Sequence, residues 1–341
     1  MLRETLRKAA DGEVLTEGEA ERALETIMEG DAPPAATAAL LTALRVRGEA
    51  VPEIVGFARG MRRFAAKVEA PDGVVDTCGT GGDAKGTINV STAAAFVARG
   101  AGVVVAKHGN RAATSRAGSA DVLEALGAEI ELGPEEVSRC IAEAGIGFMF
   151  ARTHHPAMRF VAPVRAELPF RTVFNLLGPL TNPAGAKRQL VGVFSGAYVR
   201  PVAEALRDLG AEKALVVHGT DGMDEITVTG KTIVADVSDG EFEEYEISPE
   251  DFGLPHHAPD GLLGGDAHLN ARILRDILTG EEVGASRDIV LLNAGAAIHI
   301  SGKAKTVGEG VHLARHSIGD GAAARAMEDF IKITRRLSGT V

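Results

Sequence analysis

The 341-residue sequence has only two cysteines, Cys78 and Cys140, and no long apolar run. Two cysteines in a chain of this length do not make a disulfide framework, and neither lies at metal-ligand spacing from another cysteine or a histidine. No stretch is apolar enough to span a bilayer, and the opening residues MLRETLRKAADGE lack the apolar core of a signal peptide. We therefore expect a cytoplasmic protein with no membrane association.

Basic residues are also in the minority, with 36 Lys and Arg against 47 Asp and Glu and a net charge of −11. Proteins that bind nucleic acids need a basic surface to neutralise phosphates, so the composition argues against a nucleic-acid partner. An acidic protein that binds a polyphosphate must instead concentrate its Lys and Arg at the site. Hydrophobic and charged residues make up 45% and 24% of the chain, which is typical of a globular protein, and the length predicts about two domains.

A glycine-rich stretch, DTCGTGGDAKGTINVS, begins at Asp76. It does not match the common nucleotide-binding patterns GxxxxGK[ST] and GxGxxG. Three glycines, Gly79, Gly81 and Gly82, separate a β-branched run from an Ala-rich run, an order that predicts strand, loop and helix. Glycines let backbone N–H groups approach an anion, and the start of a helix adds a positive dipole end. By itself the stretch predicts either a phosphate site or a tight turn. Cys78, within it, is expected to be a small buried side chain.

The helical and strand patterns divide the chain in two. Residues 1–66 have the spacing of short amphipathic helices, including a capping box at Thr16 and Glu19. From Val74 onward, β-branched runs alternate with helices, which is typical of a mostly parallel sheet covered on both faces. We expect an α/β fold with a small all-helical N-terminal domain (1–68), a larger α/β domain (69–341), and a helical excursion at about 160–185 that crosses back to the first domain.

The expected strands are short, and one hairpin interrupts the alternation. The hairpin is expected in ITVTGKTIVADV, with its turn at Gly230 and Lys231. The tail is expected to return to helix at 267–278, 288–300 and 322–337. The expected strands are Val74–Thr77, Val103–Ala106, Glu129–Leu132, Gly147–Phe150, Leu190–Phe194 and Ala214–His218.

Three of these strands are followed by loops rich in polar residues. The loops are GTGGD at 79–83, KHGNRAATS at 107–115 and GTDGMDE at 219–225. Ligands of parallel sheets bind at the carboxyl ends of the strands, so we expect the three loops to form one site. Glycine amides with Lys107 and Arg111 suit phosphate, and the adjacent carboxylates Asp224 and Glu225 suit Mg²⁺.

Taken together, the motifs resemble the anthranilate phosphoribosyltransferase family, tryptophan-pathway enzymes of the nucleoside phosphorylase-like class. They occur in order over nearly the whole chain: GTGGD, NVST, KHGNR, GSADVLEALG, Asp224-Glu225 and NLLGPLTNP. The chain departs from the family at Ala112-Ala113, where a Ser-Val type pair is usual, so a phosphate contact there would come from backbone amides.

The resemblance implies transfer of the phosphoribosyl group of phosphoribosyl pyrophosphate (PRPP) to the amine of anthranilate, with two Mg²⁺ ions and a homodimer. It assigns Asn110, Arg165 and Gly79 to anthranilate. Lys107, His108, Asp224 and Glu225 are the expected catalytic residues, and His108 is expected to position substrate rather than act as a base. Ser91, Asp224 and Glu225 are the expected metal ligands. The residues implied to hold PRPP are Gly79, Gly82, Asp83, Thr87, Asn89, Ser91, Thr92, Lys107 and Ser119. The other substrate-binding residues implied, besides Arg165, are Val90, His108, Gly109, Asn110, Arg111, Ala112, Ala113, Thr114 and Ser115.

Two other functions are compatible with this architecture. A pyrimidine nucleoside phosphorylase would carry a His-Ser-Thr type loop where this chain has Cys78-Gly79-Thr80. A non-enzymatic nucleic-acid-binding relative would need a basic groove, against which the net charge of −11 argues.

Overall fold

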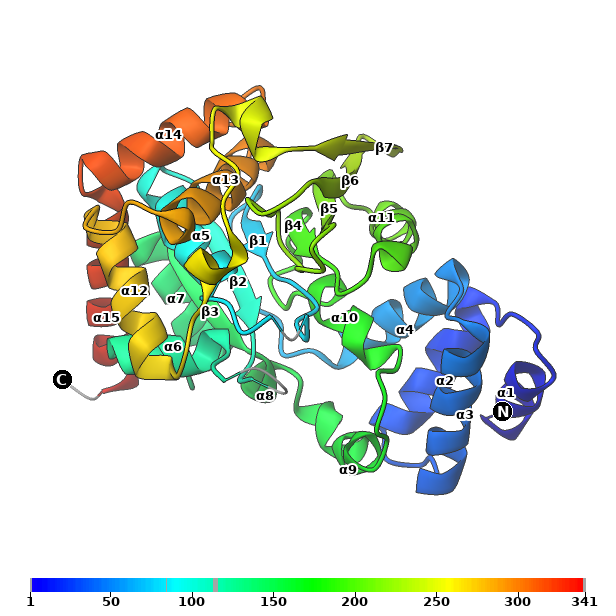
Figure 1. The fold of residues 1–341 in the computed structure, drawn as a ribbon. Helices are drawn as coiled ribbons and strands as arrows, with labels where there is room; N and C mark the ends of the chain where they lie inside the picture. Colours follow the sequence, from blue (N-terminus) through cyan, green and yellow to red (C-terminus); the bar gives the residue numbers. More distant parts are fainter. Residues whose placement is uncertain (1, 84, 113–115, 340–341) are drawn as a thin grey trace.

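The computed structural model describes residues 2–83, 85–112 and 116–339. A bundle of helices at one end of the molecule is followed by a larger body built on a sheet (Figure 1). Within the described part of the chain, no helix has the length and apolar character needed to cross a membrane. The bundle consists of α1 (Leu2–Ala10), α2 (Glu17–Met28), α3 (Pro34–Arg47) and α4 (Val51–Phe64).

Local sequence signals fix the ends of the bundle helices. The expected capping box is present at the start of α2, where the Thr16 hydroxyl accepts from the Glu19 backbone and the Glu19 carboxylate accepts from Thr16. Helix α3 begins at Pro34 and is followed by Gly48 at φ +93°, a backbone angle that favours glycine. At Gly56 of α4, an added Cβ would lie 2.3 Å from the Glu17 carbonyl oxygen, so α2 and α4 pack almost backbone to backbone.

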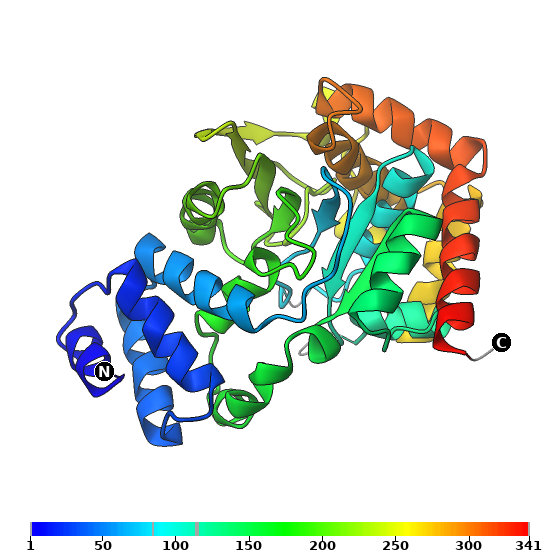
Figure 2. The same cartoon turned by 180° about the vertical axis from the view of Figure 1, so that it is seen from behind.

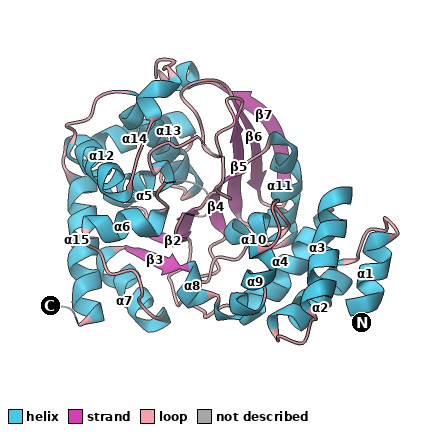
Figure 3. Ribbon diagram, turned by 60° about the horizontal axis from the view of Figure 1, so that its bottom comes forward, coloured by secondary structure: helices cyan, strands magenta, loops and turns pink. Residues whose placement is uncertain are grey.

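The larger body contains one seven-stranded sheet of order β3-β2-β1-β4-β5-β6-β7. The first five strands in this order are parallel, while β6 and β7 are antiparallel to their neighbours, so the expected mostly parallel sheet is confirmed. Figure 3 shows the sheet in its helical surroundings. The strands are β1 (Val75–Thr77), β2 (Val105–Gly109), β3 (Ile146–Phe150), β4 (Arg188–Gly192), β5 (Lys213–Gly219), β6 (Thr232–Ser238) and β7 (Glu241–Ile247).

Helices cover both faces of the sheet. Along β4 and β5, alternate residues enter different cores: Leu190 and Leu215 pack with the C-terminal helices, and Val191 and Val216 pack with α11 (Val199–Asp208) and the bundle. Figure 2 shows the fold from behind, with the C-terminal helices α14 and α15 in orange and red. The helices on the face of the first core are α5 (Val90–Gly100), α6 (Ser119–Leu126), α12 (Ala267–Thr279), α13 (Ala285–Ile300), α14 (Val307–Gly319) and α15 (Ala322–Ser338). Helix α7 (Pro134–Ala144) contributes Cys140 and Ala144 to this core and Val137 and Ile141 to a third, smaller one.

A helical segment links the bundle to the sheet. It comprises α8 (Ala151–His154), α9 (Ala162–Ala166) and α10 (Phe174–Leu180), with a 3₁₀ turn at Pro156–Phe160. Val161, Phe174 and Leu177 from this segment share one buried core with the bundle helices. The Phe174 ring also packs edge-on against Phe57 of α4, at 6.4 Å between centroids. The segment therefore attaches both parts of the molecule to each other.

Two of the strand predictions were wrong. Residues 129–132 are not a strand but an irregular segment leading into α7; Ile130 and Leu132 are buried there, which accounts for the alternating pattern. The hairpin lies further along the chain than expected, with its turn at Asp239 and Gly240, both at positive φ. Residues 226–229 fold back instead, because the Thr227 hydroxyl donates to the Asp221 carboxylate at 2.6 Å.

Candidate functional site

The glycine loop and the acidic loop meet where the parallel strands end. The Gly81 N–H donates to Oδ2 of Asp224 at 2.7 Å, which joins the loop after β1 to the loop after β5. A Cβ at Gly79 would lie 2.7 Å from the same carboxylate oxygen, so this position has no room for a side chain. Gly81 and Gly82 have φ of +69° and +80°. The glycines are thus required by two separate constraints, close approach and positive φ.

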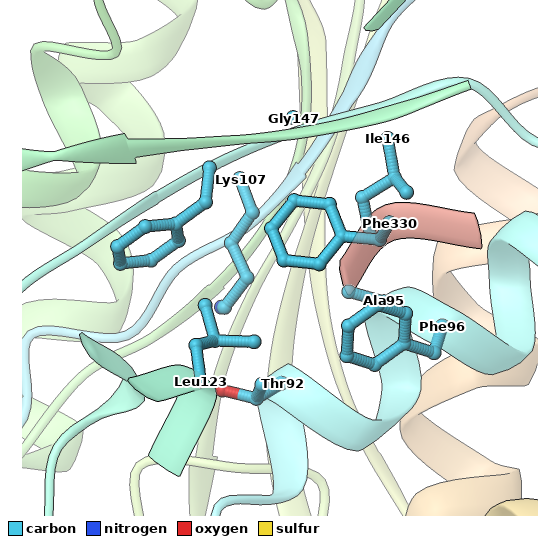
Figure 4. Close-up of a pocket in the computed structure, with 9 residues that line it drawn as sticks. Thr92, Ala95, Phe96, Lys107, Leu123, Ile146, Gly147 and Phe330 are labelled. Carbon is cyan, nitrogen blue, oxygen red and sulfur yellow. The ribbon is translucent and has the colours of Figure 1, made fainter. Parts of the chain in front are cut away.

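Lys107 lies beneath the glycine loop. It is 3% exposed, and its ammonium donates to the Thr77 carbonyl and, at 3.2 Å, to Oγ of Ser91. Figure 4 shows this side chain beside a cavity of about 10 Å³, lined by apolar groups from Ala95, Phe96, Phe148 and other residues. The cavity is too small for a substrate. Lys107 therefore places a buried positive charge next to Ser91, in the first turn of the helix that follows the loop.

Acidic side chains lie close to one another in the same region, and their pKa values are shifted. Burial, and then the charge of Asp83, raises the pKa of Asp224 to about 6. Burial and the charge of Asp224 raise the pKa of Glu225 well above its usual range, while Lys107 and a hydrogen bond from the Ser91 backbone act in the opposite direction. Like charges held close together in a partly desolvated site favour binding of a cation. Ser91, Asp224 and Glu225, the expected metal ligands, therefore lie in one place.

A network of buried hydrogen bonds supports His108, which follows Lys107 in β2. The His108 N–H donates to Asp76 at 3.0 Å, and the Asn182 amide donates to the other Asp76 oxygen at 2.7 Å. Nδ1 of His108 lies 3.0 Å from the Gly178 carbonyl oxygen, so the ring bridges β2 and α10. Burial and the nearby His155 lower the pKa of His108 to about 3, which makes it a weak base and agrees with a positioning role.

Asn89 and Thr87 are fixed by contacts with a distant segment. The Asn89 amide donates to the Ala117 carbonyl at 3.1 Å, and its oxygen accepts from the buried Asn270 at 2.9 Å. Thr87 forms an isolated β-bridge with Leu263. Val90 and Thr92 are buried at the start of α5. The Val90 N–H donates to the Ile88 carbonyl at 2.9 Å, whereas the Thr92 hydroxyl has no hydrogen-bond partner among the described residues.

The loop after β2 is largely occupied by contacts within the protein. Arg111 forms ion pairs with Asp121 and Glu124, and its guanidinium lies 5.4 Å from the Phe150 ring centroid. The Ala112 N–H donates to Asp121 at 3.0 Å. Gly109 and Asn110 precede α6, which begins at Ser119. The predicted residues Ala113, Thr114 and Ser115 lie outside the described residues.

Arg165 lies on α9, in the segment that links the two parts of the molecule. Its guanidinium is 5.4 Å from the centroid of the Phe174 ring, and burial lowers its pKa. Among the described residues no acidic side chain forms an ion pair with Arg165, and this includes Glu167. Arg165 is thus a half-buried cation without a carboxylate partner in the described chain.

Several residues that hold the site were not predicted from the sequence. Asp76 and Asn182 support His108, Asn270 holds Asn89, and Arg171 donates to the Gly82 carbonyl. Asp76 lies in the glycine-rich stretch and Asn182 in the NLLGPLTNP motif, but their roles depend on contacts between distant segments. Of the other expected residues, Cys78 is buried as predicted, and burial raises the pKa of its thiol.

Comparison with known proteins gives matches over nearly the whole chain. Residues 3–65 match the helical bundle domain, and residues 71–324 the a/b domain, of the glycosyl transferase family. The chain is 81% identical to an anthranilate phosphoribosyltransferase of Rubrobacter xylanophilus, covering 99% of each chain.

Two solved structures are similar to this one. The anthranilate phosphoribosyltransferase of Thermus thermophilus superposes with a TM-score of 0.92 at 49% identity, covering 97% of this chain and 99% of that one. The Saccharomyces cerevisiae enzyme, in complex with PRPP and Mg, superposes with a TM-score of 0.89 at 29% identity, covering 98% of each chain.

Gly192, the last residue of β4, lies against the backbone of Asp224, and this contact gives a test of the site. A Cβ on Gly192 would lie 1.6 Å from the Asp224 carbonyl oxygen, so Gly192→Ala must displace the acidic loop. A misplacement of about 1 Å costs about a hundredfold in rate. We expect turnover to fall by that order, measured alongside thermal unfolding. Gly319→Ala, where no atom lies within 4 Å of the added methyl, should leave turnover unchanged. Equal turnover in the two variants would contradict the assignment.

Proposed function

The chain belongs to the anthranilate phosphoribosyltransferase family, and we propose that its active site is formed by the glycine loop, Lys107 and the Asp224-Glu225 pair. It transfers the phosphoribosyl group of PRPP to the amine of anthranilate, giving N-(5-phosphoribosyl)anthranilate and pyrophosphate. The functional prediction made from the sequence is thereby confirmed. The hydrogen bond between Gly81 and Asp224 carries the proposal for the site, because it brings the phosphate-binding and acidic loops together.

We propose that the backbone of the glycine loop and the N-terminus of α5 hold the pyrophosphate of PRPP. Gly81 and Gly82 adopt the left-handed backbone conformation, and without side chains they allow a phosphate to approach the loop backbone, while the buried Lys107 supplies positive charge. Asn89 and Ser91 complete this side of the site, and Asp83, Thr87 and Ser119 lie around it. As pyrophosphate departs from C1 of the ribose, the fixed donors stabilise the charge that develops on the leaving group.

The acidic pair suits Mg²⁺. Asp224 and Glu225 are held apart from solvent with raised pKa values, and the Ser91 hydroxyl lies on the other side of the same region. Oxygen ligands of this kind are those that Mg²⁺ prefers, with further positions filled by water and substrate phosphates. We propose two ions per subunit, with Glu225 shared. Bound Mg²⁺ would supply charge neutralisation for the leaving pyrophosphate.

Anthranilate is proposed to bind between the two parts of the molecule. Arg165 offers a planar guanidinium that matches a carboxylate, and Gly79 and Asn110 follow strands β1 and β2 of the sheet. The aromatic amine is already unprotonated at neutral pH. It can therefore attack the oxocarbenium-like carbon from the face opposite the leaving group, which inverts that carbon, without early help from a base. His108 then serves to position groups between β2 and α10.

The function is tested by mixing the protein with PRPP, Mg²⁺ and anthranilate and following the loss of anthranilate fluorescence. The site is tested by removing the charges of Asp224 and Glu225. Asp224→Asn and Glu225→Gln should each lower turnover at saturating PRPP by at least about tenfold, since each removes charge that holds the metal. Asp239→Asn, in the remote hairpin turn, is the matched control and should match the wild type. Wild-type rates in both site variants across a Mg²⁺ titration would contradict the metal assignment.

Arg165 gives a test of the acceptor site. Arg165→Ala removes a charged hydrogen bond worth roughly 1.5–3 kcal/mol, so anthranilate affinity should fall about ten- to a hundredfold. PRPP affinity should stay nearly unchanged, because the Arg165 guanidinium lies over the Phe174 ring and, among the described residues, forms no hydrogen bond or ion pair with the glycine loop. Calorimetry with each ligand measures both. Equal losses for the two substrates, or none for anthranilate, would show that Arg165 only supports the scaffold.

We also propose a cytoplasmic homodimer joined through the helical end of the molecule. The domains are taken as 1–68 and 69–341, with the segment at about 160–185 crossing to the bundle. Several large apolar side chains at this end are exposed: Val14, Val46, Phe160 and Phe170, of which Val46 is 83% exposed. Exposed apolar side chains favour association with a partner, which we propose to be a second copy of the chain.

Sedimentation equilibrium at micromolar concentration is expected to give twice the chain mass. Val46→Glu places a charge on the proposed interface and should shift the equilibrium toward monomer by at least about tenfold, the equivalent of 1.4 kcal/mol. Val283→Glu changes a similarly exposed valine in the loop before α13 and should leave the dimer intact. A monomeric wild-type protein would refute the proposal.

A further inference from the structure

Arg171 lies between α9 and α10, on the segment that joins the bundle to the sheet. Its guanidinium makes two contacts. Nη2 donates a hydrogen bond to the carbonyl oxygen of Gly82, and Cζ lies 4.3 Å from the centroid of the Phe194 ring. A guanidinium can make both contacts at once because it donates in its plane and stacks through its face.

The contact with Gly82 is a close fit. Gly82 has φ +80°, and a Cβ at this position would lie 3.1 Å from Nη2 of Arg171. The positive charge of Arg171 also favours the ionised form of Asp224, in opposition to the burial that raises the pKa of that carboxyl. Arg171 is therefore placed beside both the glycine loop and the acidic pair.

Phe194, under the guanidinium, is tied to the same loop. The Phe194 N–H donates to the Thr80 hydroxyl at 3.0 Å, and the Thr80 N–H donates to the Gly192 carbonyl at 2.8 Å. Residues 80–82 are thus held at one end by the segment after β4 and at the other by Arg171. Loss of Arg171 would leave the Gly82 end without this hydrogen bond.

The contacts continue from Phe194 toward the bundle. The Phe194 ring packs edge-on against Tyr198 at 5.1 Å, and the Tyr198 hydroxyl donates to Oε2 of Glu49 at 2.8 Å. Glu49 is buried in the turn between α3 and α4. A continuous series of contacts therefore runs from the glycine loop to the helical bundle.

We propose that Arg171 is a positioning residue for PRPP: its guanidinium holds the Gly82 end of the glycine loop in the conformation that receives the pyrophosphate, and the bundle supports it through Phe194 and Tyr198. This inference rests on the proposed function of the loop. It adds a residue outside the loop that determines the loop's geometry, and it predicts that changes at the bundle affect PRPP affinity.

Calorimetric titration with PRPP and Mg²⁺ tests the role of Arg171. Arg171→Gln should weaken PRPP binding about tenfold, as expected for a charged hydrogen bond lost next to the ligand. Arg171→Lys keeps the charge but cannot bond Gly82 and stack on Phe194 together, and should lose about threefold. Arg159→Gln is the matched control, because Arg159 lies on the same segment with its guanidinium 4.6 Å from the Phe160 ring; it should bind PRPP as the wild type does.

Wild-type PRPP affinity in a folded Arg171→Gln protein would overturn the inference, and so would equal losses in the Arg171 and Arg159 variants. If Arg171→Gln does not fold, wild-type affinity in Arg171→Lys has the same meaning. Failure of the wild-type protein itself to consume anthranilate would instead count against the proposed function.

A double-mutant cycle tests the link to the bundle. Tyr198→Phe removes the hydrogen bond to Glu49 and keeps the ring. It should weaken PRPP binding about two- to threefold alone and have no further effect in the Arg171→Gln background. Additive effects of the two substitutions, or no effect of Tyr198→Phe, would show that the bundle does not act through Arg171.

Discussion

Two adjacent carboxylates, Asp224 and Glu225, held near the buried Lys107 are the constraint on which the rest of the site depends. Asp224 and Glu225 repel each other, the charge of Asp83 adds to this repulsion, and burial raises the cost of keeping Asp224 and Glu225 ionised. The fold holds them there through backbone contacts, since Gly192 and Gly79 allow the acidic loop to approach two strand ends. An arrangement that is unfavourable without a cation becomes favourable when a cation and a polyphosphate bind together. Binding of substrate and metal is therefore expected to be mutually dependent.

The architecture could be predicted because its signals are local. Capping residues mark the starts of helices such as α2, and β-branched runs mark strands that are buried on both faces. The errors came where a local pattern has two explanations. Residues 129–132 alternate because two apolar side chains anchor an irregular segment, and Thr227 is β-branched but serves to bond Asp221. Only the tertiary contact distinguishes these cases from strands.

The site was predictable to the extent that parallel strands bring their carboxyl ends together. That rule placed the glycine loop, Lys107 and the acidic pair near one another. It did not identify the residues that support them from far along the chain. Asn270 lies 181 residues from the Asn89 that it holds, and Asn182 lies 106 residues from Asp76. Neither amide has a local pattern that distinguishes it from an ordinary polar residue.

The final strand, β7, ends the sheet, and within the described part of the chain one of its edges has no neighbouring strand. Such an edge offers free N–H and C=O groups to any extended chain, which makes it a site where protein molecules can add to one another. In this strand four of seven residues are glutamates, Glu241, Glu243, Glu244 and Glu246, and they are largely exposed. A second copy of β7 aligned along this edge would bring its own four glutamates against them. The same acidity that contributes to the net charge of −11 therefore also protects the sheet against growth into aggregates.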